Sequence, residues 1–177
     1  MKLRLLPLAL IALLLLAFGA SAACGGDSEE SLALEEYFRQ LEALNDTADE
    51  RAVELQEAYD AERAAAASDE EVLAALEDFF KNTQLIFTTF ADGSSDLIPP
   101  AVVEELHIEL VVGSVELAAS LEDMLNGLGD LDSAADLEGL LEESGLSQAE
   151  DRFAETCATL QDTADRNEID VDLDCAD

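Results

Sequence analysis

Hydrophobic positions recur at helical spacing along most of the chain. Between residues 31 and 66, apolar or small side chains return every three or four positions, which predicts one long amphipathic helix, or two with a break near Asn45-Asp46. A second stripe spans 68–93 and carries four of the seven phenylalanines, with Ser68 and Glu71 forming a capping box at its start. Because aromatic side chains bury the most apolar area, we expect this second helix at the centre of the core.

A third helical stripe follows the loop DGSSDLIPP. Pro100 suits the first turn of a helix, where a missing N–H costs nothing, and the stripe of valines and leucines continues to Leu128. Between 130 and 146, Ser133 can cap a short connector helix that ends at Gly145. This connector is expected to cover one end of the helical assembly.

The last helix is predicted to open with a capping box formed by Ser147 and Glu150, and it places Cys157 on its apolar face. After about residue 166 the period changes to two, since apolar residues alternate with aspartates over 169–175, as in an extended, half-buried tail. The helix beyond Cys157 covers about 14 Å and the tail can return about 20 Å. We therefore expect a disulfide between Cys157 and Cys175; a thiolate metal site would need further Cys or His ligands.

Together these elements predict an all-α fold: a bundle of three to four long amphipathic helices with a short connector helix and a disulfide-pinned extended C-terminal tail. The expected connections are short and no internal repeat occurs. We therefore expect a single helical-bundle domain over residues 31–177.

The net charge of the chain limits the classes of molecule that it can bind. The chain has 42 acidic and 8 basic residues, a net charge of -34. Two of those basic residues, Lys2 and Arg4, precede every acidic one, so that the chain from Cys24 onward carries 42 acidic and six basic residues, a net -36. A nucleic acid partner is excluded, because there is no basic patch for a phosphate backbone.

The N-terminus has the three parts of an export signal. Lys2 and Arg4 precede an apolar run from Leu5 to Phe18, and small residues follow over 19–23. The run is about 14 residues long, whereas a spanning helix needs roughly 20. Residues 1–23 are therefore predicted to be a cleaved signal peptide.

The tetrapeptide Ser21-Ala22-Ala23-Cys24 resembles the lipobox of bacterial lipoproteins, with Ser21 where leucine is usual. The resemblance implies lipidation of Cys24, a lipid-anchored linker over 24–30 and an extracytoplasmic protein held at the bacterial cell membrane. Ordinary signal-peptidase cleavage after Ala22 or Ala23 is the alternative. It would leave an odd, exposed thiol in a secreted protein, so the cysteine count favours lipidation.

Two sets of residues are weak candidates for a metal site. Glu104 and His107 resemble one Glu-x-x-His motif of ferritin-like di-iron bundles, but that site needs two such motifs and the chain has a single histidine. We expect His107 to be a boundary residue that bonds a backbone group or a carboxylate. Asp170, Asp172 and Asp174 lack the glycine and glutamate of an EF-hand loop. No resident metal or other cofactor is predicted.

Catalytic motifs are absent from the sequence: it has no GxSxG, no glycine-rich phosphate loop and no HExxH. We therefore expect a non-enzymatic protein. The general architecture resembles that of uncharacterised acidic helical lipoproteins of bacterial envelopes, which implies a structural or protein-interaction role with an envelope partner. The alternative is an extracytoplasmic module that binds a small solute or a cation. An aromatic groove would favour the binding module, and a filled core with shallow clefts would favour the interaction role.

Overall fold

A computed structural model describes residues 26–131, 133 and 136–175. Five helices lie in these ranges: α2 (Gly26–Ala65), α3 (Asp69–Ser95), α4 (Glu104–Leu128), α5 (Leu137–Ser144) and α6 (Leu146–Arg166). The described part of the chain contains no β-strand. The predicted all-α class is thus confirmed, as is the disulfide between Cys157 and Cys175. Cys24 and the predicted signal peptide lie outside the described residues.

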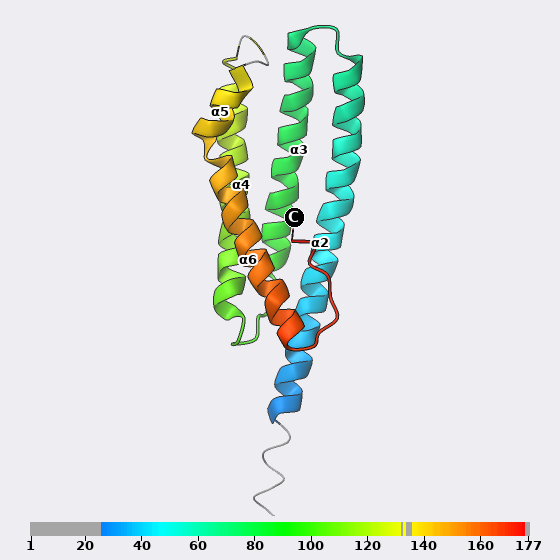
Figure 1. Ribbon diagram of the computed structural model, residues 1–177, viewed down its shortest axis with the longest axis vertical. Helices are drawn as coiled ribbons and strands as arrows, with labels where there is room; N and C mark the ends of the chain where they lie inside the picture. Colours follow the sequence, from blue (N-terminus) through cyan, green and yellow to red (C-terminus); the bar gives the residue numbers. More distant parts are fainter. Residues whose placement is uncertain (1–25, 132, 134–135, 176–177) are drawn as a thin grey trace, which may run out of the picture.

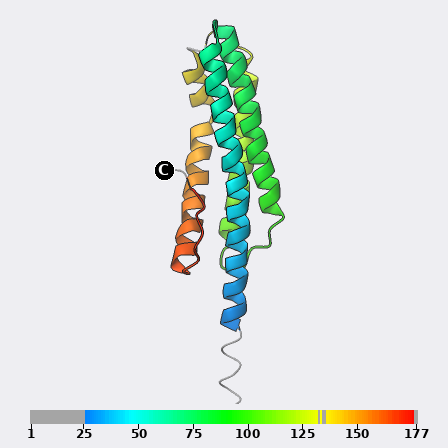
Figure 2. The ribbon, with the colours of Figure 1, turned by 90° about the vertical axis from the view of Figure 1, so that its right-hand side faces the viewer.

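The long helices α2, α3 and α4 run side by side, with α3 between the other two (Figure 1). The chain then returns through the short α5 and through α6, which packs mainly against α4. In Figure 1, α6 crosses the molecule diagonally from α5 to the lower part of α2, and the C-terminal tail then runs back upward, bonded to both helices. Figure 2 shows that the first turns of α2 project beyond the rest of the molecule.

Helix α2 is continuous and longer than its hydrophobic pattern predicts. It passes through Asn45 and Asp46 without a break, and it begins at Gly26. Residues 26–30, which were predicted to belong to a linker, are therefore part of this helix. Two acidic residues near this end, Glu29 and Glu30, favour helix formation because negative charge stabilises a helix N-terminus.

The predicted N-terminal cap is confirmed for one helix and wrong for two others. The backbone N–H of Glu71 donates to Ser68 Oγ (3.3 Å), as predicted for α3. By contrast, α5 begins after Asp136 rather than at Ser133, and α6 begins directly after Gly145, where the N–H of Leu146 donates to Ser144 Oγ (3.3 Å). Gly145 has φ 71°, the left-handed conformation that glycine tolerates best, and it joins α5 to α6 by itself. A one-residue joint leaves no room for the capping box predicted at Ser147.

The core consists of two apolar clusters along the long axis. The lower one contains Phe38, Phe90, Leu110, Leu160 and Leu173, among others. The upper one contains Leu76, Phe80, Leu117, Leu121, Met124, Leu128, Leu146 and Ala149. Phe153 of α6 packs against both clusters, so the two form one continuous interior.

The C-terminal tail is extended, as predicted, and its apolar side faces the helices. The chain reverses after α6 at Glu168, which adopts φ 57°. Leu173 is only 1% exposed, while the aspartates on either side of it are exposed. The side-chain amide of Gln161 makes two hydrogen bonds to the tail. Its Nε2 donates to the carbonyl of Val171 (3.0 Å), and its Oε1 accepts from the N–H of Leu173 (2.9 Å). The disulfide then fixes the end of the tail to α6.

Candidate functional site

A groove of about 670 Å³ lies between α2 and α6. These two helices approach each other at the lower end of the molecule and diverge upward, so that α3 is visible between them (Figure 1). The groove residues, taken from α2, α3, α4, α6 and the tail, include Ala48, Asp49, Ala52, Leu55, Phe79, Phe87, Phe90, Leu117, Leu121, Glu150, Phe153 and Asp174. We call this feature the α2–α6 groove.

The direction of α6 opens the groove. Helix α6 packs against α4 where Phe153 lies beside Gly113; a Cβ at position 113 would make ordinary van der Waals contact with Phe153, 3.7 Å from its Cα. Helix α6 is thereby held against α4, and its upper part leaves α2 without a neighbour on that side. The aromatic face of α3 is covered only in part as a result.

Aromatic rings make the floor of the groove. Phe153 contacts Phe87 and Phe90 edge-on, with ring centroids 5.8 Å and 5.9 Å apart. Toward the upper end, Phe79 packs against Tyr59, with centroids 4.9 Å apart. Such edge-on contacts are favourable between aromatic rings, and they hold this surface in place before any ligand arrives. Phe79 and Phe87 are half-buried, and both line the groove.

Carboxylates line the edges of the groove. Burial raises the pKa of Asp49, and the neighbouring charges of Asp174 and Asp46 raise it further. At the other end, partial burial raises the pKa of Glu150, and the charge of Asp151 adds to the effect. None of the residues that line the groove is a lysine or an arginine. The groove therefore combines an apolar floor with a negative rim.

The tail closes the lower end of the groove. Asn45 Nδ2 donates to the carbonyl oxygen of Leu173 (2.7 Å) and to Asp49 Oδ2 (3.0 Å). Cys157 Sγ lies 3.7 Å from the same carbonyl oxygen of Leu173, and Cys157 and Cys175 both line the groove. One network thus fixes the tail, the lower end of α2 and the Asp49 carboxylate in relation to one another.

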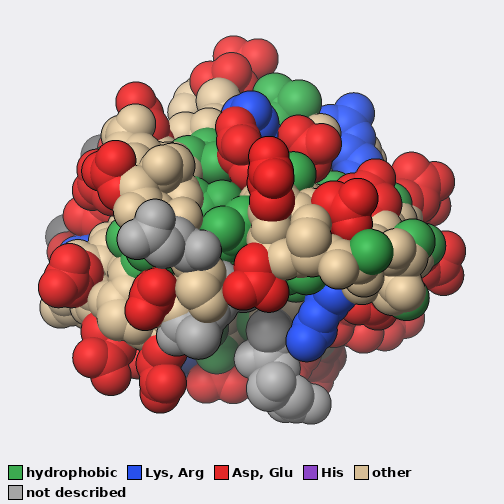
Figure 3. Space-filling view, turned by 90° about the horizontal axis from the view of Figure 1, so that it is seen from above, with side chains coloured by type: hydrophobic (Ala, Val, Ile, Leu, Met, Phe, Trp, Pro, Cys, Tyr) green, Lys and Arg blue, Asp and Glu red, His purple; other side chains and the backbone are tan. Residues whose placement is uncertain are grey.

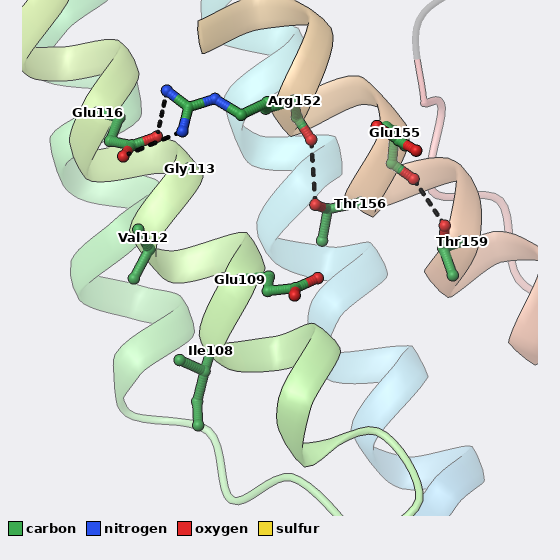
Figure 4. Close-up of a pocket in the computed structure, with 9 residues that line it drawn as sticks. All are labelled: Ile108, Glu109, Val112, Gly113, Glu116, Arg152, Glu155, Thr156 and Thr159. Atoms are coloured by element: carbon green, nitrogen blue, oxygen red, sulfur yellow. Dashed lines mark hydrogen bonds and ion pairs between the residues drawn. The ribbon is translucent and has the colours of Figure 1, made fainter.

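A second, shallower pocket of about 480 Å³ lies between α4 and α6 on the outer surface (Figure 4). Its cation is already neutralised, because Arg152 pairs with Glu116 at 2.9 Å. Its two hydroxyl groups bond their own helix: Thr156 donates to the carbonyl of Arg152 and Thr159 to that of Glu155. This pocket offers a ligand fewer free polar groups than the α2–α6 groove does.

The structure separates Glu104 from His107. Glu104 is exposed, whereas His107 is buried and its Nδ1 lies 3.2 Å from the hydroxyl of Tyr37. The partner of His107 is therefore a tyrosine rather than the expected backbone group or carboxylate. Burial lowers the pKa of His107 and raises that of Tyr37, so both groups are neutral at pH 7. This arrangement is a structural contact between α2 and α4.

The three tail aspartates point outward from the helices and are exposed. Asp172 Oδ1 accepts from the backbone N–H of Asp174 (3.1 Å), while Asp174 also reaches the edge of the groove. Within the described residues, no three His, Cys, Asp or Glu side chains are placed so that they could hold a metal ion. Of the weak metal candidates, only Asp174 belongs to the α2–α6 groove.

When the molecule is viewed from above, acidic side chains cover much of the surface, and hydrophobic side chains are visible between them (Figure 3). Among the helices described, none has an apolar stretch long enough to cross a membrane. Comparison of the chain with known protein families, curated proteins and solved structures found no match.

The groove residues were not predicted as a site from the sequence. A signal was present in Phe79 and Phe80, because adjacent helical positions point about 100° apart and together make the apolar face of the helix wide. Phe87 lies on the same wide aromatic face. An aromatic face this wide indicates either that the helix is buried on several sides or that part of the face is not covered by another helix.

Proposed function

We propose that this protein is an extracytoplasmic, lipid-anchored helical-bundle module that binds a small, elongated and mainly apolar organic solute. The observation that carries this proposal is the aromatic floor of the α2–α6 groove. The sequence offered two alternatives, and an aromatic-lined groove favours solute binding over a purely structural role.

The size and shape of the groove support the proposal. Its volume of about 670 Å³ falls within the range of about 300–1,000 Å³ typical of small-molecule sites. Its floor follows α3 from Phe90 to Phe79, eleven residues apart, which corresponds to about 16 Å. Because packing against Phe153 and Tyr59 already fixes these rings, a ligand would lose little affinity to ordering them.

The proposed location rests on the N-terminal sequence and on the cysteines. The leader over 1–23 and the lipobox-like Ser21-Ala22-Ala23-Cys24 favour export and lipidation. The disulfide is consistent with this, since such bonds persist in oxidising compartments. Mass spectrometry of the mature N-terminus tests the anchor. An acylated Cys24 is expected, and an unmodified terminus would contradict it.

An interaction role is the second candidate, and the outer face of α4 favours it. Ile108, Val112 and Val115 follow one another at helical spacing there and are each about half exposed. Such a strip can contact a partner protein. None of these three residues lines the α2–α6 groove, and Ile108 and Val112 line the second pocket instead (Figure 4).

Solute binding can be tested with N-phenyl-1-naphthylamine, an uncharged fluorescent probe. We expect saturable one-to-one binding to the wild-type protein. Ala52→Trp places an indole in the groove and should abolish binding, because the side chain occupies the space above the aromatic floor. The matched control is Ala61→Trp, which adds the same side chain at an exposed position of α2 outside the groove. Unsaturable binding, or equal binding by both variants, would contradict the proposal.

A further inference from the structure

The negative charges at the lower end of the groove have no basic partner in the described residues. Asp49 and Asp174 lie close enough for their charges to interact, and Asp46 is nearby. Three ion pairs occur in the described structure, Arg39–Glu35, Lys81–Glu77 and Arg152–Glu116, and none includes a groove aspartate. Like charges held together beside an apolar surface favour the arrival of a cation.

The position of these charges relative to the aromatic floor is well defined. Asn45 bonds both Asp49 and the tail, so the two aspartates belong to one fixed network. The same end of the groove contains Phe90 and the disulfide, and the floor continues from there toward Phe79. A molecule lying along this floor would have one end at the carboxylates and the rest of its length over the rings.

The upper end of the groove restricts the ligand further. Glu150 and Asp151 line the groove there, so a negative group at either end of a bound molecule would meet like charge. A bare metal ion would leave the aromatic floor unused, and a neutral apolar molecule would leave the aspartates unpaired. An organic cation with an apolar body satisfies both features, since ammonium groups also interact favourably with aromatic faces.

We propose that the ligand of the α2–α6 groove is an amphipathic organic cation, whose ammonium or guanidinium group lies at Asp49 and Asp174 and whose apolar body lies along Phe90, Phe87 and Phe79. This inference rests on the proposed function, because it names the chemical class of the solute. It accounts for the absence of basic residues from the groove lining.

Proton release provides a signature of this arrangement. The pKa of Asp49 is raised, mainly by burial and also by Asp174 and Asp46. A bound cation stabilises the charged carboxylate and brings this pKa down, so binding should release protons where the free carboxyl is partly protonated. Titrations in two buffers of different ionisation enthalpy would reveal the release, which should grow as the pH is lowered toward the ordinary pKa of an aspartate.

The test compares three molecules of equal length, octylammonium, 1-octanol and octanoate, by calorimetric titration at pH 7. We expect octylammonium to bind tightest and octanoate weakest. Asp49→Asn with Asp174→Asn should lower the affinity for octylammonium about tenfold, equivalent to about 1.4 kcal/mol, and leave that for 1-octanol within about twofold. Unchanged 1-octanol binding also shows that the double variant keeps a folded groove.

The matched control is Glu54→Gln with Asp162→Asn, which removes the same charge at two exposed positions outside the groove. An equal loss of octylammonium affinity in both double variants would overturn the inference, because attraction would then come from the overall charge. Equal binding of all three molecules would also overturn it while the proposed function stands. Failure of the uncharged naphthylamine probe, by contrast, would count against the proposed function itself.

Discussion

Removing the Cys157–Cys175 disulfide tests how the tail is held. The two cysteines are 18 residues apart, and a crosslink closing a loop of this size stabilises the folded state by about 3 kcal/mol in the chain-entropy model. Without the disulfide, the remaining contacts of the tail do not exceed the entropy cost of ordering it. Four hydrogen bonds at about 1 kcal/mol each, together with burial of Leu173 at about 2 kcal/mol, are at most comparable to the cost of ordering seven residues at about 1–2 kcal/mol each.

We therefore expect Cys157→Ala with Cys175→Ala to lower the free energy of unfolding by about 3 kcal/mol and the melting temperature by roughly 6–12 °C. Both this variant and its reference carry Cys24→Ser, so that the third thiol cannot form mixed disulfides. Urea denaturation followed by circular dichroism gives the change, and hydrogen exchange shows whether the N–H of Leu173 loses protection before α3 does. A change below about 0.5 kcal/mol, or full protection of Leu173 in the variant, would refute the reasoning.

Three further predictions concern single features of the fold. Gly145→Ala should destabilise by about 1 kcal/mol in urea denaturation, because φ 71° disfavours a side chain although no atom lies within 4 Å of the new Cβ. Ser94→Ala should be neutral or stabilise by up to about 1 kcal/mol in the same assay, since Ser94 Oγ is buried without a hydrogen-bond partner in the described structure; a loss above 1 kcal/mol would show that the hydroxyl has one. The raised pKa values of Asp49 and Glu150 mean that their contribution to stability is fully present below their ordinary pKa values and is lost as pH rises through the raised ones. The melting temperature should therefore rise as pH falls from 7 to about 4.5, and less so in Asp49→Asn with Glu150→Gln; equal pH profiles would contradict this.

The helices could be predicted because each long one contributes an apolar stripe at regular spacing. The tail and its disulfide could also be predicted, since the change of period at residue 169 and the reach from Cys157 to Cys175 are local properties. The start of α6 could not: its capping box at Ser147 is locally plausible, but the single-residue joint at Gly145 places this serine inside the helix.

The groove depends on contacts between residues far apart in the sequence. Its opening follows from the position of α6, which packs against α4 with Phe153 beside Gly113, 40 positions earlier in the chain. Its negative lower end needs Asp174 of the tail beside Asp49 of α2. Hydrophobic periodicity describes which face of a helix is buried, but not which neighbour covers it or how completely. The aromatic face of α3 was therefore assigned to the core as a whole.

Because α2 is unbroken, the distance from its N-terminal end to the groove is fixed. Asn45 follows Gly26 by 19 residues, or about 28 Å of helix, and residues 29–33 are exposed below the core. A lipidated Cys24 with α2 upright would hold the groove more than three screening lengths from the lipid headgroups, since that length is about 8 Å at physiological ionic strength. Lipid charge would then have little influence on the solute at the groove. Affinity would be the same on anionic and on zwitterionic membranes, and the helix would act as a spacer that keeps recognition independent of the surface beneath it.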